Sequence, residues 1–103
     1  MRKLGIAMTL KLETEEEKKF VEEAFKIGCK AIKFVDPGSI NAPDRMVLCP
    51  HARVIFFEFK RPGKDSRRGQ KTYQKGLEGM MFEVHQVYTC EQALVLLKDF
   101  LCS

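Results

Sequence analysis

The feature that most constrains the fold is a short apolar run that contains a single acid. Residues 54–59 are Val-Ile-Phe-Phe-Glu-Phe, and Lys60 follows directly. A run this short and this rich in β-branched and aromatic residues predicts a buried strand. In a strand, Glu58 and Lys60 point to the same face because they are two residues apart. A carboxylate in a buried strand needs a charged or hydrogen-bonding partner, so we expect an acid and an amine together at the strand end.

A second apolar run predicts a hairpin and brings in another acid. Residues 46–49 precede the first run, and Pro50-His51-Ala52 separates the two. If the turn is centred on His51, Asp44 lies opposite Glu58, with the two Cβ atoms roughly 4.5–5.5 Å apart. Two carboxylates at that spacing favour a divalent cation, and oxygen ligands suit Mg²⁺ or Mn²⁺ better than zinc. A register shift of one residue would turn Asp44 to the other face, so this prediction depends on the loop length.

The remaining patterns predict helices around a small sheet. Thr14-Glu15-Glu16-Glu17 has the form of a capping box at the start of a helix over 14–27. Residues 31–35 and 82–88 are typical of strands. A second capping box, Thr89-Cys90-Glu91-Gln92, follows the last strand and leads into the apolar helix over 93–101. A further helix begins near Ser66, with Gln70 on its apolar face. The order α-β-β-β-α-β-α predicts an α/β fold with a small mixed sheet flanked by helices, and 103 residues are enough for one domain, 1–103.

Charge is concentrated in one segment. The whole chain has 18 Lys+Arg against 14 Asp+Glu, and its net charge of only +4 is too small to indicate a particular kind of partner. Residues 60–75 hold seven positive residues against Asp65 alone, a net charge of +6, and these are Lys60, Arg61, Lys64, Arg67, Arg68, Lys71 and Lys75. The segment covers a turn and a helix start, where backbone N–H groups also attract phosphate. It predicts a nucleic-acid contact, and the alternative is a solvated helix face.

Cysteine usage and hydropathy indicate a reducing compartment and no membrane partner. The four cysteines include no C-x-x-C pair, and Cys49-Pro50-His51 with His85 fits no structural zinc spacing. No run approaches the roughly 18 apolar residues that span a bilayer, and the apolar stretch at the N-terminus is too short for a secretory signal. We therefore expect a cytoplasmic protein with free or buried thiols.

Each candidate site residue has a structural alternative. Asp44 could be only a turn residue, and Glu58 with Lys60 only a charged pair on an edge strand. Glu17 heads the buried stripe of the first helix, but it could instead complete the capping box with Thr14. Gln70 leads the apolar face of its helix, but it could be an ordinary polar residue near a helix start. Local patterns leave these alternatives open.

Taken together, these residues resemble the VRR-NUC family of the PD-(D/E)xK nuclease superfamily. The resemblance extends from about Glu13 to Leu97, with Cys29, Asn41 and Met81 standing where the family usually has glycine. The matching positions are Gly28, Lys33-Phe34-Val35, Pro37-Gly38, Pro43-Asp44-Arg45, Glu58-Phe59-Lys60-Arg61-Pro62-Gly63, Ser66, Gln70 and the helix around Leu77. The ordered combination is specific, whereas E-x-K alone is common.

The resemblance implies a fold of the PD-(D/E)xK restriction-endonuclease-like type and a metal-dependent DNA nuclease. Asp44, Glu58 and the Phe59 carbonyl would bind Mg²⁺ or Mn²⁺, and Lys60 would be the catalytic lysine. Glu17 and Gln70 match the acidic and glutamine positions of the two helices. Stand-alone members of the family are phage or prophage proteins. The resemblance therefore also implies a homodimer that acts on branched DNA, such as a four-way junction, without sequence preference. Such a protein would work in the cytoplasm of a bacterial host.

Two other functional classes compete with this interpretation. A non-catalytic nucleic-acid-binding or assembly module could keep the same fold. A hydrolase of small phosphoesters could use the same carboxylates, but it has less use for the long basic segment.

Overall fold

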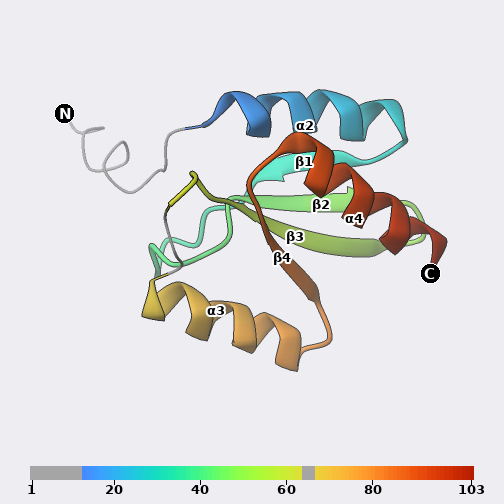
Figure 1. Ribbon diagram of the computed structural model, residues 1–103. Helices are drawn as coiled ribbons and strands as arrows, with labels where there is room; N and C mark the ends of the chain where they lie inside the picture. The colour runs from blue at the N-terminus through green and yellow to red at the C-terminus, as the bar shows by residue number, and fades with distance from the viewer. Residues whose placement is uncertain (1–12, 64–66) are drawn as a thin grey trace.

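The computed structural model describes residues 13–63 and 67–103, which form a four-stranded mixed sheet with helices on both faces (Figure 1). The strand order is β1-β2-β3-β4, with antiparallel pairing except between β3 and β4, which are parallel. The elements in chain order are α2 (Glu15–Lys26), β1 (Lys30–Lys33), β2 (Arg45–Cys49), β3 (Arg53–Phe59), α3 (Arg68–Gly79), β4 (Glu83–Val87) and α4 (Cys90–Cys102). The predicted fold class and element order are confirmed.

The predicted hairpin register is also confirmed. Met46 pairs with Phe56 and Leu48 with Val54, as a turn centred on His51 requires. His51 and Ala52 both have positive φ, 66° and 60°. Such a turn conformation matches the right-handed twist of the two flanking strands in a tight hairpin. The ladder begins at Arg45, so Asp44 lies one residue before the first pair.

Several element ends differ from the expected ones. Strand β1 stops at Lys33, short of the predicted Val35. Helix α4 begins at Cys90, directly after the N-cap Thr89 of the predicted capping box with Gln92, which is confirmed. Thr14 caps α2 as predicted, since its hydroxyl accepts from the Glu17 N–H at 3.0 Å. Ser66, near which this helix was expected to begin, lies outside the described residues, and Arg67 is the N-cap of α3.

The two faces of the sheet bury different cores. Helices α2 and α4 cover one face together, where Phe20 packs against Phe57 with ring centroids 5.0 Å apart. Helix α3 covers the other face, where a smaller cluster surrounds Phe56. Phe56 is therefore core rather than the interface surface that its apolar character also allowed. The larger core consists of Phe20, Ala24, Cys29, Ala31, Val47, Cys49, Ile55, Phe57, Phe59, Val87, Cys90, Ala93 and Leu97.

Backbone conformation explains one departure from the family pattern. Met81, which stands where the family usually has glycine, has φ 73° and is 91% exposed just after α3. Glycine adopts that left-handed conformation without strain, whereas Met81 carries the backbone strain of a Cβ there, and its exposed side chain adds no clash with the rest of the domain.

None of the described helices is long and apolar enough to cross a membrane.

Candidate active site

Helices α2 and α3 begin at one end of the sheet (Figure 1). Most of the predicted site residues belong to the elements that meet at this end. Strands β1 and β3 finish there, and the 34–44 segment crosses it before β2 begins. Both helices direct their positive dipole ends toward it, which favours bound anions.

On the α3 face, Glu58, Lys60 and Gln70 form a buried network. The Lys60 Nζ lies 3.3 Å from Glu58 Oε2 and donates to Gln70 Oε1 at 2.6 Å. The Gln70 Nε2 donates to the same Glu58 oxygen at 2.8 Å. Glu58 and Gln70 are 1% and 2% exposed, and the Lys60 side chain only 10%. The structure therefore brings the predicted acid and lysine together, as the strand periodicity required.

Gln70 links this network to the start of α3. Its Oε1 also accepts from the Arg67 N–H at 3.0 Å, which satisfies a backbone donor at the helix N-terminus. One amide thus caps the helix, accepts from the lysine and donates to the acid. Gln70 is more than a polar residue near a helix start, because all three partners fix the orientation of its amide.

Asp44 lies against the same strand end. Its Oδ2 accepts from the Phe59 N–H at 2.7 Å, which belongs to the peptide that joins Glu58 to Phe59. Its own carbonyl accepts from the Phe34 N–H at 3.0 Å, which extends the β1–β2 pairing by one step. Pro43, just before it, is fully buried. The Asp44 carboxylate is therefore held beside the Glu58–Phe59 peptide, although β2 has not yet begun.

A buried ion pair lies on the opposite face of the sheet. The Arg45 Nε donates to Glu17 Oε2 at 2.7 Å, and the Arg45 guanidinium also contacts Glu13. Burial, followed by repulsion from Asp44, raises the pKa of Glu17, and Arg45 opposes that rise. The Glu17 carboxylate thus binds Arg45, while its backbone N–H serves the Thr14 cap.

Arg45 is the residue that the sequence reasoning missed as part of the site. Its position opposite Phe57 places it on the core face, where it is only 6% exposed. The signal was present in the register, since a charged residue on a buried face of a strand requires a partner.

The 34–44 segment is fastened to the start of α3. The Tyr73 hydroxyl donates to Asp36 Oδ2 at 2.8 Å, and the Arg67 guanidinium donates to the Ile40 carbonyl at 3.3 Å. A Cβ at Gly69 would lie 2.5 Å from the side chain of Asn41, so the helix approaches the segment as closely as glycine allows.

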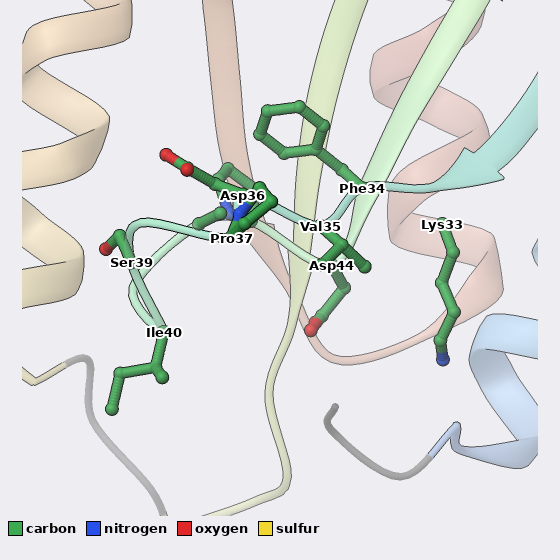
Figure 2. A pocket seen from close by; sticks show the side chains of 10 residues that line it. Lys33, Phe34, Val35, Asp36, Pro37, Ser39, Ile40 and Asp44 are labelled. Atoms are coloured by element: carbon green, nitrogen blue, oxygen red, sulfur yellow. The ribbon is translucent and has the colours of Figure 1, made fainter. Parts of the chain in front are cut away.

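This segment encloses a cavity of about 90 Å³ next to Asp44 (Figure 2). Figure 2 shows the side chains of Lys33 and Asp44 extending in the same direction, away from the Phe34 ring. Lys33 also exerts a favourable charge interaction on Glu17, so it belongs to the same charged end of the sheet.

Comparison with known proteins agrees with this architecture. A solved structure described as "VRR_NUC domain" superposes with a TM-score of 0.67 at 23% identity, over 79% of this chain and 89% of that one. The chain has the VRR_NUC fold. No family model matches the sequence.

A curated protein is also similar to part of the chain. "Putative nuclease p44" of Acyrthosiphon pisum secondary endosymbiont phage 1 is 47% identical over 57 residues, which is 55% of this chain. The match spans only 61% of that protein's length. Together with the fold, this similarity confirms the resemblance to the VRR-NUC family that the sequence predicted.

On the VRR_NUC fold, the basic segment lies beside the charged end of the sheet. Its described members other than Lys60 are all exposed, whereas Lys60 is held inside the network with Glu58. Lys64 lies outside the described residues. The exposed members are Arg61, Arg67, Arg68, Lys71 and Lys75. Arg67 and Arg68 stand at the first positions of α3, where their charge adds to the helix dipole.

The donor chemistry of the site fits a hard cation. Asp44 and Glu58 offer carboxylate oxygens on either side of one peptide, and the Phe59 carbonyl is a third oxygen of the kind that Mg²⁺ or Mn²⁺ accepts. A carboxylate has about four lone-pair positions, so the bonds that Gln70 and Lys60 make to Glu58 Oε2 leave room for a metal ion. Within residues 13–63 and 67–103, no three His, Cys, Asp or Glu side chains gather into a metal-binding cluster. The predicted metal site takes only two side-chain ligands, the carboxylates of Asp44 and Glu58.

Proposed function

We propose that this chain is a nuclease that hydrolyses phosphodiester bonds in DNA with the help of Mg²⁺ or Mn²⁺. The observation that carries the proposal is the convergence of Asp44, Glu58 and Lys60 at the sheet end where two helices begin. The VRR_NUC fold and the similarity to a phage protein with nuclease in its name support the same activity.

In this proposal, Asp44, Glu58 and the Phe59 carbonyl hold the cation. When bound, the cation would supply Lewis-acid polarisation of the scissile phosphate and a more acidic water. The Asp44 carboxylate is kept in place by the Phe59 N–H, so the carboxylate and the carbonyl-bearing residue are held by the same short segment of β3.

Lys60 acts on the negative charge of the phosphate. Its ammonium is largely buried and is held by Glu58 and Gln70, so it can donate to a phosphate oxygen without losing much conformational entropy. Gln70 is a positioning residue for Lys60 and Glu58, because it contacts both and lies too deep to reach the substrate. Glu17 is a positioning residue through Arg45, which directly follows Asp44.

The exposed arginines and lysines around α3 supply the DNA contact. They neutralise backbone phosphates on either side of the site and read no base sequence. We further propose branched DNA, such as a four-way junction, as the substrate and a homodimer as the active species. A two-fold dimer presents two sites to a symmetric junction, and one such domain carries one site.

The test is a cleavage assay on three labelled substrates: a four-way junction, a linear duplex and a flap. We expect Mg²⁺- or Mn²⁺-dependent cleavage that EDTA abolishes and that Asp44→Asn reduces by at least about 100-fold. Glu78→Gln is the matched control, because that acid is exposed on α3 and should leave the rate unchanged. Failure to cleave any substrate, or full activity of Glu58→Ala, would overturn the proposal.

The same variants separate catalysis from binding. Junction binding that survives Asp44→Ala and Glu58→Ala, with no metal bound in calorimetry, would identify a binding module instead. Salt-insensitive turnover of a small phosphodiester would indicate a small-molecule hydrolase. Light scattering across a concentration series tests the dimer.

A further inference from the structure

Two cysteines face each other at the end of the sheet opposite the candidate active site. The β1–β2 register pairs Lys30 with Leu48, so the next step outward places Cys29 opposite Cys49. Both residues point to the core face under α2 and α4, and they are 2% and 9% exposed. Cys29 directly precedes β1, and Cys49 is the last residue of β2.

The hydrogen-bond pattern shows what kind of pair this is. In an antiparallel ladder, hydrogen-bonded and non-hydrogen-bonded pairs alternate. The Phe34 N–H donates to the Asp44 carbonyl at 3.0 Å, so counting back along β1 makes Cys29/Cys49 a non-hydrogen-bonded pair. The Cys29 N–H indeed donates elsewhere, to the Ala24 carbonyl at 2.9 Å.

Non-hydrogen-bonded pairs bring side chains closest together. Their Cα atoms lie about 4.5 Å apart, which falls inside the range of roughly 4.4–6.8 Å found for disulfides. Burial, followed by hydrogen bonding to the Cys29 thiol and the charge of that thiol, raises the pKa of Cys49 to about 12. The Cys49 Sγ donates to the Val47 carbonyl at 3.7 Å, and the register places the Cys29 side chain directly across from it.

The pair is also reachable from solvent. Cys29 and Cys49 line the same open surface groove, together with Gly28, Leu48 and Pro50. Leu48, at the rim, is 39% exposed. Because the two cysteines are themselves only 2% and 9% exposed, a small disulfide reaches the sulfurs when the rim of the groove opens locally, without global unfolding.

We propose that Cys29 and Cys49 form a reversible redox pair that oxidises to an intramolecular disulfide. The oxidant is a small disulfide such as oxidised glutathione. A Cys29 thiolate attacks one sulfur of that molecule, its S–S bond breaks, and one glutathione leaves as a thiol. The Cys49 thiol then gives up its proton as its sulfur displaces the second glutathione, which leaves as a thiol. The two protein thiols lose two electrons to the glutathione disulfide, and their two protons appear on the released thiols.

The bond would close a loop that contains β1, the 34–44 segment and most of β2. Closing a loop of this length constrains the unfolded chain and raises the midpoint of thermal unfolding by on the order of 10 °C. The pair lies away from Asp44, Glu58 and Lys60, so we expect the cleavage rate to stay the same.

The test uses the full-length wild-type protein with graded oxidised glutathione, followed by alkylation, trypsin digestion and mass spectrometry. We expect the intact mass to fall by about 2 Da, the loss of two hydrogens on closing one S–S bond. Trypsin should release residues 27–30 joined to residues 46–53, and a dithiol reductant should separate them. Cys29→Ser and Cys49→Ser should each remove the thermal shift, whereas Cys102→Ser, at the exposed C-terminal cysteine, should keep it.

The same measurement is repeated with the oxidant present during refolding from urea, when both thiols are exposed to it. Recovery of Cys29 and Cys49 as separate thiols or separate glutathione adducts under both conditions would overturn the proposal. Linkage of either one to Cys90 or Cys102 instead would also overturn it.

Discussion

The two faces of the sheet carry charge in different ways. Under α2 and α4, the Glu17–Arg45 pair lies at the margin of an extended apolar core, and each charge neutralises the other. Under α3, the apolar cluster around Phe56 is small, and Glu58, Lys60 and Gln70 form a network next to it. Asp44 sits at the end of the sheet between them.

This difference between the two faces indicates that one face mainly stabilises the fold and the other mainly holds the candidate active site. The doubly covered face buries enough apolar surface to hold the domain together, so its ion pair can serve to position the start of β2. On the singly covered face the lysine and the acid are also buried, but they lie at the basic end of the molecule, next to the exposed Arg67 at the start of α3. Phe57 and Glu58 are neighbours in β3 and belong to opposite faces, so they provide the most direct contrast.

The largest effect is expected for Glu58→Gln, measured as the rate of DNA cleavage. Replacing the charge while keeping the shape should lower the rate by about 1,000-fold, because a group that acts on transition-state charge is removed. The amide can still hydrogen-bond to Gln70, but Lys60 loses its buried counter-charge, so the free energy of unfolding should also fall, by about 3 kcal/mol. Unchanged cleavage together with a large loss of stability would place Glu58 among the structural residues and erase the contrast between the faces.

Phe57→Ala should damage stability instead. Phe57 is fully buried against Phe20, and truncating such a residue costs about 4 kcal/mol of unfolding free energy. Phe56→Ala is the matched variant on the α3 face and should cost about 3 kcal/mol, because its surroundings are smaller and less enclosed. Urea unfolding of both variants measures the difference, and a larger cost at Phe56 would mean that α3 covers the main core.

Arg45→Met tests the buried ion pair. Removing the cation leaves Glu17 buried without its partner and should cost about 3 kcal/mol near pH 8. The pKa of Glu17 is already raised, and losing Arg45 raises it further, so the folded variant takes up a proton more readily than the unfolded chain does. The cost should therefore shrink as pH falls toward 5.

Urea unfolding at pH 8 and pH 5 checks this dependence. The double variant Arg45→Met with Glu17→Met should recover part of the loss at pH 8, because no buried charge is left over. A cost that does not vary with pH and is not reduced in the double variant would mean that the pair does not act as a unit.

The smallest effect is expected at Tyr73, which fastens the 34–44 segment to α3. Burial and the bond to Asp36 raise the pKa of Tyr73 to about 12. A raised folded pKa contributes stability that is fully present below pH 10 and is lost as pH rises toward 12. Unfolding free energy should therefore fall more steeply between pH 10 and 12 in the wild type than in Tyr73→Phe. Equal slopes would show that this clamp does not influence stability.

Much of the fold followed from local pattern because burial imposes periodicity. The apolar runs around Pro50-His51-Ala52 predicted the register correctly, and that register placed Glu58 and Lys60 on one face. The Thr14 cap was predicted from a local hydrogen bond between neighbours. The end of β1 was not, because Val35 is apolar enough for a strand but lies beyond the last partner that β2 offers.

The sequence by itself determined the order of elements, the hairpin register and the acid–lysine pair on one face of a strand. These depend on residues that are close along the chain or related by a short turn. Only the tertiary structure decided that Arg45 pairs with Glu17, that Gln70 joins Lys60 to the start of α3, and that Cys29 faces Cys49. The first two contacts depend on how the helices pack on the sheet, and the third depends on how β1 pairs with β2 across the 34–44 segment. Local pattern carries no information about either arrangement.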